Sequence, residues 1–280
     1  MKSLFFAIIL LFAAGPYALA ASSGKSGACG TFSADSTELL IDADIVRIPD
    51  YAFADCRKLR RVCFAPGSKC TEIGRFAFLG CASLECVELP ASLHTLQEGA
   101  FRECSALRQI QLPQAVTIIP AQCFSWCTAL EEVDMLSAPE DIRQFAFIYC
   151  FALRAFDFGD RLRHIGNNAF SRCESLREAI LPPGVEEIES YAFSDCLSLE
   201  RAVLPANDRL LGELIFSNTP ALRALVAPSP LPPPFDCRSF PFEPDDANAR
   251  SRCVLYVPED ARDAYLSADG WSIFTSNTSL

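Results

Sequence analysis

Cysteine is the residue type in this sequence with the clearest capacity for chemistry, because the 280-residue chain contains 14 of them. Such a number in a secreted chain ordinarily indicates a disulfide framework. Half of them, however, recur in one phase of a repeat: Cys56, Cys81, Cys104, Cys127, Cys150, Cys173 and Cys196. Residues in one phase point the same way from successive units and lie side by side. With Thr219 in the eighth such position, we predict free, buried thiols that act as small apolar side chains.

The cysteines outside that phase are better candidates for disulfide bonds: Cys29, Cys63, Cys70, Cys86, Cys123, Cys237 and Cys253. Cys237 and Cys253 flank an acidic stretch, and the sequence leaves a bridge between them open. Cys63 and Cys86 fall on neighbouring predicted strands and face solvent. A bridge there is also left open, because the pattern does not fix the distance between the two residues.

The sequence offers no constellation for catalysis or metal binding. Cys123 and Cys127 have the spacing of a zinc ligand pair, but Cys127 belongs to the inward phase and no second pair is near. The two histidines, His94 and His164, occupy different phases and lie three repeats apart. No Ser-His-Asp arrangement, G-x-S-x-G motif or phosphate-binding loop is present. We therefore predict that the protein is not an enzyme and has no catalytic residue, cofactor or bound metal.

The elements that position these residues are copies of one unit, I-x-x-x-A-F-x-x-C-x-x-L-x-x-V-x-L-P-x-x-L, which is clearest from Ile73 to Thr95. Its Phe falls at Phe53, Phe78, Phe101, Phe124, Phe147, Phe170, Phe193 and Phe216. The first interval between these residues is 25 and every later one is 23. A fixed period in the twenties is typical of a solenoid, and L-x-x-V-x-L is typical of the strand of a leucine-rich repeat. We expect the Phe column to form a spine opposite the strands.

The unit closely resembles the BspA-type leucine-rich repeats, a 23-residue class of surface proteins in host-associated bacteria and some protists. The motif A-F-x-x-C-x-x-L carries the resemblance, which covers about Ile48 to Pro228, and the ending LYVPEDARDAYLSADGWSIF is similar to the C-terminal cap of such proteins. The resemblance implies an α/β repeat fold: a right-handed leucine-rich-repeat solenoid with a parallel β-sheet on the concave face. It also implies attachment to host matrix proteins or to other cells.

The predicted domain organisation follows from where the 23-residue period begins and ends along the chain. Residues 1–20 are predicted to be a signal peptide, because Lys2 precedes an apolar run that ends before an Ala-Leu-Ala site. That run is shorter than the ~20 residues of a membrane span, so we expect no membrane insertion after cleavage. Residues 21–47 are a linker and N-terminal cap, with Leu39 and Ile41 on one face. Residues 48–228 are eight repeats, and 229–280 form a C-terminal cap.

The charge of the chain limits its partners. The formal net charge is −11, and cleavage of the signal peptide would remove Lys2 and make it −12. An acidic solenoid lacks the basic contacts that nucleic acids require, and it is not attracted to anionic membranes. We therefore expect that the protein binds neither, and the predicted signal peptide indicates that it is secreted or surface-exposed. The oligomeric state stays open.

Two rows of side chains are predicted to share the concave face. The residues two and four after each repeat's Leu should point there, since side chains alternate along a strand. The acidic row is Glu132, Asp134, Asp157 and Glu178, and the apolar row is Ile180, Val203 and Val226. An apolar row at solvent positions indicates a binding surface or a surface covered by the C-terminal cap. We predict a binding protein for a protein or glycan ligand, with a structural module of an envelope complex as the alternative.

Overall fold

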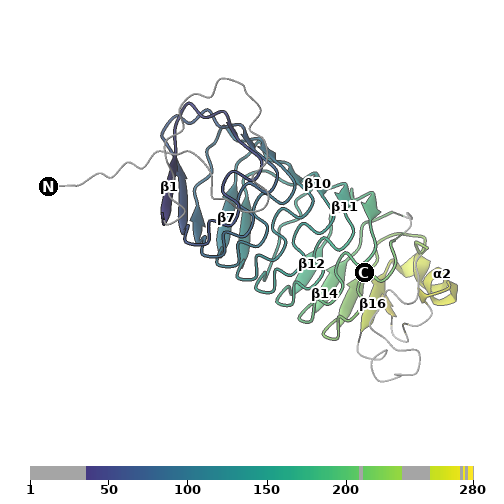
Figure 1. Ribbon diagram of the computed structural model, residues 1–280. Coiled ribbons are helices and arrows are strands. Elements are labelled where there is room, and N and C mark those ends of the chain that lie inside the picture. The colour runs from purple at the N-terminus through teal and green to yellow at the C-terminus, as the bar shows by residue number, and fades with distance from the viewer. Residues whose placement is uncertain (1–35, 208–210, 235–252, 272–273, 275–276, 280) are drawn as a thin grey trace.

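The chain folds into an elongated array of coils, each lying beside the one before (Figure 1). This computed structural model describes residues 36–207, 211–234, 253–271, 274 and 277–279. The predicted signal peptide and Cys29 and Cys237 lie outside these ranges. The predicted leucine-rich-repeat solenoid is confirmed, although turns take the place of helices on the convex side of the described repeats.

One set of parallel strands comprises the L-x-x-V-x-L segments of the repeats and strands of the two predicted caps, and we call its surface the concave face. The strands are β1 (Glu38–Ile41), β3 (Arg61–Phe64), β5 (Cys86–Val87), β7 (Gln109–Leu112), β9 (Glu132–Met135), β12 (Glu178–Ile180), β14 (Arg201–Val203), β15 (Ala224–Val226), β16 (Val254–Val257) and β17 (Asn277–Ser279). Their register is offset by one repeat, so that Gln109 pairs with Glu132 and Gln111 with Asp134. Burial alternates along β7, as expected for strands with one face in a core.

The fifth repeat interrupts this sheet. Its segment between β9 and β12 forms no strand, and the sheet divides there, as it also does between β5 and β7, into separately hydrogen-bonded groups. Phe156 and Phe158 occupy the positions that Val and Leu take in the template, and both are buried. Their rings pack edge-on against Phe170, at centroid distances of 5.2 and 5.4 Å. We attribute the interruption to these two large side chains, which need more room than the residues they replace.

A second set of short parallel strands was not predicted, and we call them the lateral strands. They are β2 (Arg47–Ile48), β4 (Glu72–Ile73), β6 (Thr95–Leu96), β8 (Ile118–Ile119), β10 (Asp141–Ile142), β11 (His164–Ile165) and β13 (Glu187–Ile188). Each buries the Ile or Leu that opens the template and leaves the preceding residue at least partly exposed. The solenoid therefore has a sheet on two sides of its core.

The predicted Phe spine is confirmed as a continuous stack of rings. Successive rings from Phe53 to Phe216 lie at centroid distances of 5.1 to 5.8 Å, with planes within 19° of parallel. Between Phe53 and Phe193, the backbone N–H of each stacked Phe donates to a carbonyl in the next repeat, as from Phe78 to Ala100 at 2.9 Å. The aromatic stack and this hydrogen-bond ladder together tie each coil to its neighbours.

The convex turns contain two left-handed residues in every repeat, two positions before and two positions after the stacked Phe. Their φ angles lie between 52° and 69°. The later position is occupied by Asp55, Gly80, Glu103, Trp126, Tyr149, Arg172, Asp195 and Asn218. Gly, Asn and Asp tolerate this conformation best, so the larger residues among these eight are held there by their surroundings.

The described part of the predicted C-terminal cap continues the concave sheet through β16 and β17, with η2 (Glu259–Ala261) and α2 (Arg262–Ser267) between them. Tyr265, Trp271 and Phe274 are buried, as expected for residues that close the last core face. The Tyr265 and Trp271 rings meet edge-on at 4.9 Å. No helix among the described residues is long and apolar enough to cross a membrane.

Candidate binding site on the concave face

The apolar row lies in register across three neighbouring strands. Ile180 of β12 pairs with Val203 of β14, which pairs with Val226 of β15. Exposure falls along the row, from 42% at Ile180 to 8% at Val226. The next residue in register is Tyr256 of β16, so the described part of the C-terminal region extends the row beside Val226. The exposed part of the row is therefore Ile180 and, in part, Val203.

The acidic row precedes the apolar row along the same face. Glu132, Asp134, Asp157 and Glu178 are all exposed. Gln111 donates an amide N–H to Asp134 at 2.5 Å, and Asp157 accepts the backbone N–H of Gly159 at 2.9 Å. Glu132 and Glu178 form no ion pair with any residue that the structure describes. No described cation therefore lies within ion-pair distance of either carboxylate.

The residue one position after each repeat's Leu forms a charge ladder beside the concave face in the N-terminal and central repeats. Arg60 pairs with Glu85 at 2.7 Å. Glu131 lies between two arginines and pairs with Arg108 at 3.3 Å and with Arg154 at 3.1 Å. These pairs are exposed and contribute roughly 0–1 kcal/mol each, so we assign them to strand register.

The cysteines of the concave face do not form a disulfide. Cys63 and Cys86 are half-buried free thiols. The register pairs Cys86 with Arg61, so Cys63 lies two residues farther along the neighbouring strand. At ~4.8 Å between strands and ~3.3 Å per residue, the diagonal Cα separation exceeds the ~7 Å limit for a bridge. Arg61 pairs with Glu88 at 3.0 Å between these thiols.

The in-phase cysteines are buried free thiols, as predicted, and the structure adds a hydrogen bond that the pattern did not show. Each Sγ from Cys81 to Cys196 donates to the carbonyl oxygen of the stacked Phe of the preceding repeat, at 3.1 to 3.4 Å. Burial raises the pKa of the Cys127 thiol to about 12. Cys123, predicted to bind no metal, is likewise buried and free, and the described residues contain no cluster suited to a metal ion.

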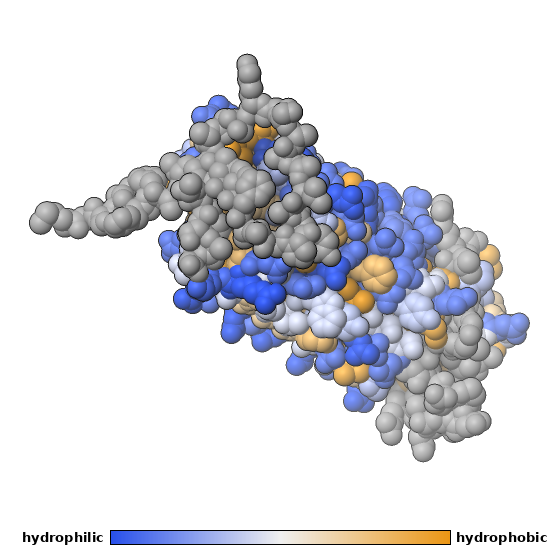
Figure 2. All heavy atoms as spheres, in the orientation of Figure 1, coloured by the Kyte–Doolittle hydropathy of each residue, from blue (hydrophilic) through white to orange (hydrophobic). Residues whose placement is uncertain are grey.

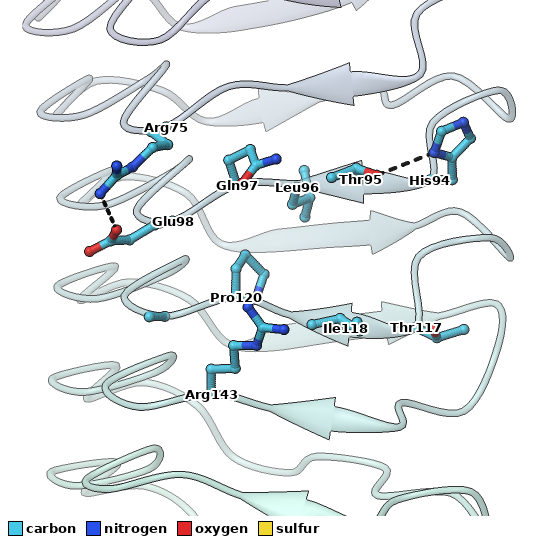
Figure 3. Close-up of a pocket in the computed structure, with 11 residues that line it drawn as sticks. Arg75, His94, Thr95, Leu96, Gln97, Glu98, Thr117, Ile118, Pro120 and Arg143 are labelled. Atoms are coloured by element: carbon cyan, nitrogen blue, oxygen red, sulfur yellow. Dashed lines mark hydrogen bonds and ion pairs between the residues drawn. The ribbon is translucent and has the colours of Figure 1, made fainter.

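A hollow of about 510 Å³ lies over the lateral strands β6 and β8, where Thr95 and Ile118 occupy a position that is charged in the neighbouring strands β4 and β10 (Figure 3). At its rim Arg75 pairs with Glu98 at 2.5 Å. Arg143 reaches into the same hollow and pairs with Asp141 at 3.1 Å. Both arginines are thus paired, and the hollow does not join the concave face.

His164 takes part in a network that sequence reasoning missed. Its Nδ1 lies 2.8 Å from Asp141 Oδ1 and its Nε2 lies 3.2 Å from Glu189 Oε1. Burial lowers the pKa of this imidazole, but the hydrogen bonds to the two carboxylates outweigh it, and the net pKa is raised above 6.5. The signal in the sequence was the residue that precedes the buried Ile of each lateral strand. Asp141 and His164 occupy this position in successive repeats and are register partners.

Comparison with solved structures gives leucine-rich-repeat proteins of low identity. A leucine-rich cell surface protein from Faecalibacterium prausnitzii is 19% identical, with 87% of this chain and 79% of that chain covered and a TM-score of 0.40. A T. pallidum leucine-rich-repeat protein is 26% identical over 74% and 79%, with a TM-score of 0.33. A Bacteroides ovatus leucine-rich-repeat protein is 19% identical over 86% and 92%, with a TM-score of 0.44. No curated protein matches the chain.

The sequence of the repeat identifies the family of the chain. The model of the BspA-type leucine-rich-repeat region matches residues 30–150 and 106–223 in six copies. These two ranges overlap and together span well over half of the chain. They also contain the stacked Phe column and the hydrogen-bonded cysteines described above. The chain therefore belongs to the BspA-type leucine-rich-repeat family.

Proposed function

We propose that the protein is a non-enzymatic adhesin that binds a protein partner through its concave face at repeats 4 to 7. The observation that carries this proposal is the meeting of two rows on one face of the solenoid, across the fifth repeat where the sheet is interrupted. The acidic row (Glu132, Asp134, Asp157 and Glu178) runs directly into the exposed end of the apolar row at Ile180. Solenoids commonly bind along such extended faces.

The two rows have different physical roles in this proposal. Charged side chains steer association and select a partner of opposite charge, whereas a desolvated apolar centre slows dissociation. The partner therefore presents a basic stretch beside an apolar side chain that covers Ile180. Glu178 lies opposite Arg201 in the register, which places a positive charge at the end of the acidic row.

The location of the protein follows from separate observations. The apolar run after Lys2 and the Ala-Leu-Ala site favour export, and the family resemblance implies a secreted or surface-exposed protein. An adhesin on the outside of the cell meets matrix proteins and neighbouring cells directly. A glycan on the concave face and a purely structural role in an envelope complex are the alternatives that an experiment must separate.

The experiment is to immobilise the chain without residues 1–20 and to measure the binding of extracellular matrix proteins, host cells and companion bacteria. Adhesion predicts saturable binding to at least one of them, and enzymatic deglycosylation of that partner leaves the binding intact. Binding that disappears on deglycosylation would show that the concave face binds a glycan of the partner and not its polypeptide. Capture of envelope proteins from the producing cell alone would favour the structural role.

A further inference from the structure

Three neighbouring convex turns present a row of flat side chains, which we call the aromatic ridge: the exposed Trp126, the half-buried Tyr149 and the exposed Arg172. They occupy the same position in repeats 4, 5 and 6, two residues after the stacked Phe. The Trp126 and Tyr149 rings stack at a centroid distance of 3.9 Å and an angle of 22°. The Arg172 guanidinium carbon lies 5.6 Å from the centre of the Tyr149 ring. Trp126 is 41% exposed.

The fold does not require aromatic side chains at this position. The backbone there is left-handed, with φ of 63° at Trp126 and 64° at Tyr149. Gly80 and Asn218 fill the same position in repeats 2 and 8, and such residues adopt this conformation at lower cost. A large residue held in an unfavourable backbone conformation at an exposed site points to a role beyond packing.

Hydrogen-bonding groups flank the ridge at both ends and are already oriented by one another. On one side Arg102 pairs with Glu103 at 3.1 Å. On the other side Arg172 lies 3.9 Å from Asp195, which accepts an amide N–H from Asn218 at 2.6 Å. Both ends therefore offer donors and acceptors on planar groups beside the aromatic faces. This combination complements a sugar ring, which has an apolar C–H face and a rim of hydroxyl groups.

The surroundings favour a sugar over a protein. Energetic hot spots of protein interfaces lie in desolvated pockets enclosed by a rim, whereas the ridge stands on a convex turn. Two hollows among the described residues are lined by other segments. On the face seen in Figure 2, hydrophilic residues predominate and hydrophobic ones occur singly or in small groups, so the described surface offers no broad apolar patch there.

The charges of the ridge and of the whole chain favour neutral sugars over anionic ones. Glu103 and Asp195 lie at the two ends of the ridge, and the chain has a net charge of −11. Because Arg102 and Arg172 pair with these carboxylates, the ridge has no excess positive charge to attract an anionic polymer, and the acidic chain as a whole repels sulfated and uronic acid polymers. We propose that the aromatic ridge is a binding site for neutral glycans, separate from the concave face and independent of its partner.

The two tryptophans of the chain make this proposal directly measurable. Trp271 is buried at 1% exposure, whereas Trp126 is exposed, so a ligand on the ridge changes the fluorescence of Trp126 alone. The probes are soluble oligosaccharides of glucose, galactose, mannose and N-acetylglucosamine, with heparin as a polyanion. We expect at least one neutral oligosaccharide to quench or blue-shift the emission in a saturable way, and heparin to have no effect.

Two variants test whether the ridge is the site. Trp126→Gly places at this turn the residue type that Gly80 provides in repeat 2, so the fold is retained, and calorimetry should show affinity for the active oligosaccharide reduced about tenfold or more. Tyr191→Ala is the matched control. Tyr191 is also exposed and also left-handed, with φ of 61°, but it lies outside the ridge, so its loss leaves affinity unchanged.

Four results would overturn the proposal: no response to any neutral oligosaccharide; a response equally strong to heparin; unchanged affinity of the Trp126→Gly variant; or capture of a deglycosylated protein that depends on Trp126. The last result would assign the ridge to a protein partner instead. Circular dichroism and thermal unfolding of both variants confirm that each measurement is made on a folded chain.

Discussion

The Sγ atom of Cys150 donates a hydrogen bond of 3.1 Å to the carbonyl oxygen of Phe124 in the preceding repeat. The same contact recurs from repeat to repeat and satisfies a carbonyl at the side of the Phe stack. In the eighth repeat Thr219 instead donates to Phe216 within its own repeat, at 2.8 Å. The in-phase cysteines thus link coils through a thiol hydrogen bond, which requires that the sulfur remain reduced.

The first prediction concerns these thiols. Burial raises the pKa of Cys127 to about 12, and the unionised thiol is a poor nucleophile. A thiol reagent added to the folded protein should therefore react with the half-buried Cys63 and Cys86 before any in-phase cysteine. After denaturation without a reductant, at least seven thiols should titrate. Fewer than seven would show that the in-phase cysteines are oxidised.

The second prediction concerns His164, whose two ring nitrogens face Asp141 on β10 and Glu189 after β13. The pKa is raised in the folded protein, so the protonated form is favoured by folding. Its contribution to stability is fully present below about pH 6.5 and is lost as the pH rises through the higher folded value. We expect the stability difference between the protein and His164→Gln, measured by urea unfolding, to shrink across this range. A difference that is constant with pH would contradict the network.

The third prediction concerns the interruption of the concave sheet. Strand β14 is hydrogen-bonded on both sides, whereas residues 155–158 of the fifth repeat form no strand. Amides in residues 155–158 should therefore exchange with deuterium faster than those of Arg201–Val203, because exchange follows local hydrogen bonding. Equal protection of the two segments would show that the sheet is continuous in solution.

Much of the fold could be predicted because the same side chains recur at one period. The Phe stack and the strand positions followed from that period, and the burial of Leu39 and Ile41 followed from their place on one face of the N-terminal cap. The lateral strands did not, since a two-residue strand such as Glu72–Ile73 is too short to show an alternating pattern. Gradual burial of the apolar row toward Val226 depends on packing at the end of the sheet, which no single repeat encodes.

The candidate site was predictable for a related reason. Side chains of one strand position align across repeats, and Ile180 and Val203 proved to be register partners. The sites that were missed combine different positions. The His164 network joins residues before and after a lateral Ile, and the hollow of Figure 3 is lined by Thr95 and Ile118 together with residues of other positions, such as Arg143.

The fourth prediction separates two effects on the concave face: the effect of the acidic row on the association rate and the effect of the apolar row on the dissociation rate. Reversing Asp134 and Asp157 to Lys should slow association with the protein partner, because both carboxylates are exposed and attract a basic surface. The effect should be larger at low ionic strength, since salt screens exposed charges beyond ~10 Å at 0.1 M. Surface plasmon resonance at two salt concentrations checks this. An effect confined to dissociation, with no salt dependence, would contradict the steering role.

The fifth prediction concerns Ile180 and requires variants that distinguish binding from folding. Leu197→Asp is the matched control, because Leu197 is 40% exposed and Ile180 is 42% exposed, but Leu197 lies outside the concave strands. Phe170→Ala removes a ring that stacks on Phe147 and Phe193 and should destabilise the array by about 3–5 kcal/mol. Ile180→Asp and Leu197→Asp should both unfold close to the unmodified protein.

The affinity of the Ile180→Asp variant for the identified protein partner, compared with that of Leu197→Asp, tests the concave-face site most directly. We predict that Ile180→Asp weakens binding by more than about 1 kcal/mol, since a carboxylate replaces an apolar contact that the partner desolvates. Leu197→Asp should bind as the unmodified protein does. Equal, undiminished affinity of both folded variants would contradict a partner on the concave face at repeats 4 to 7.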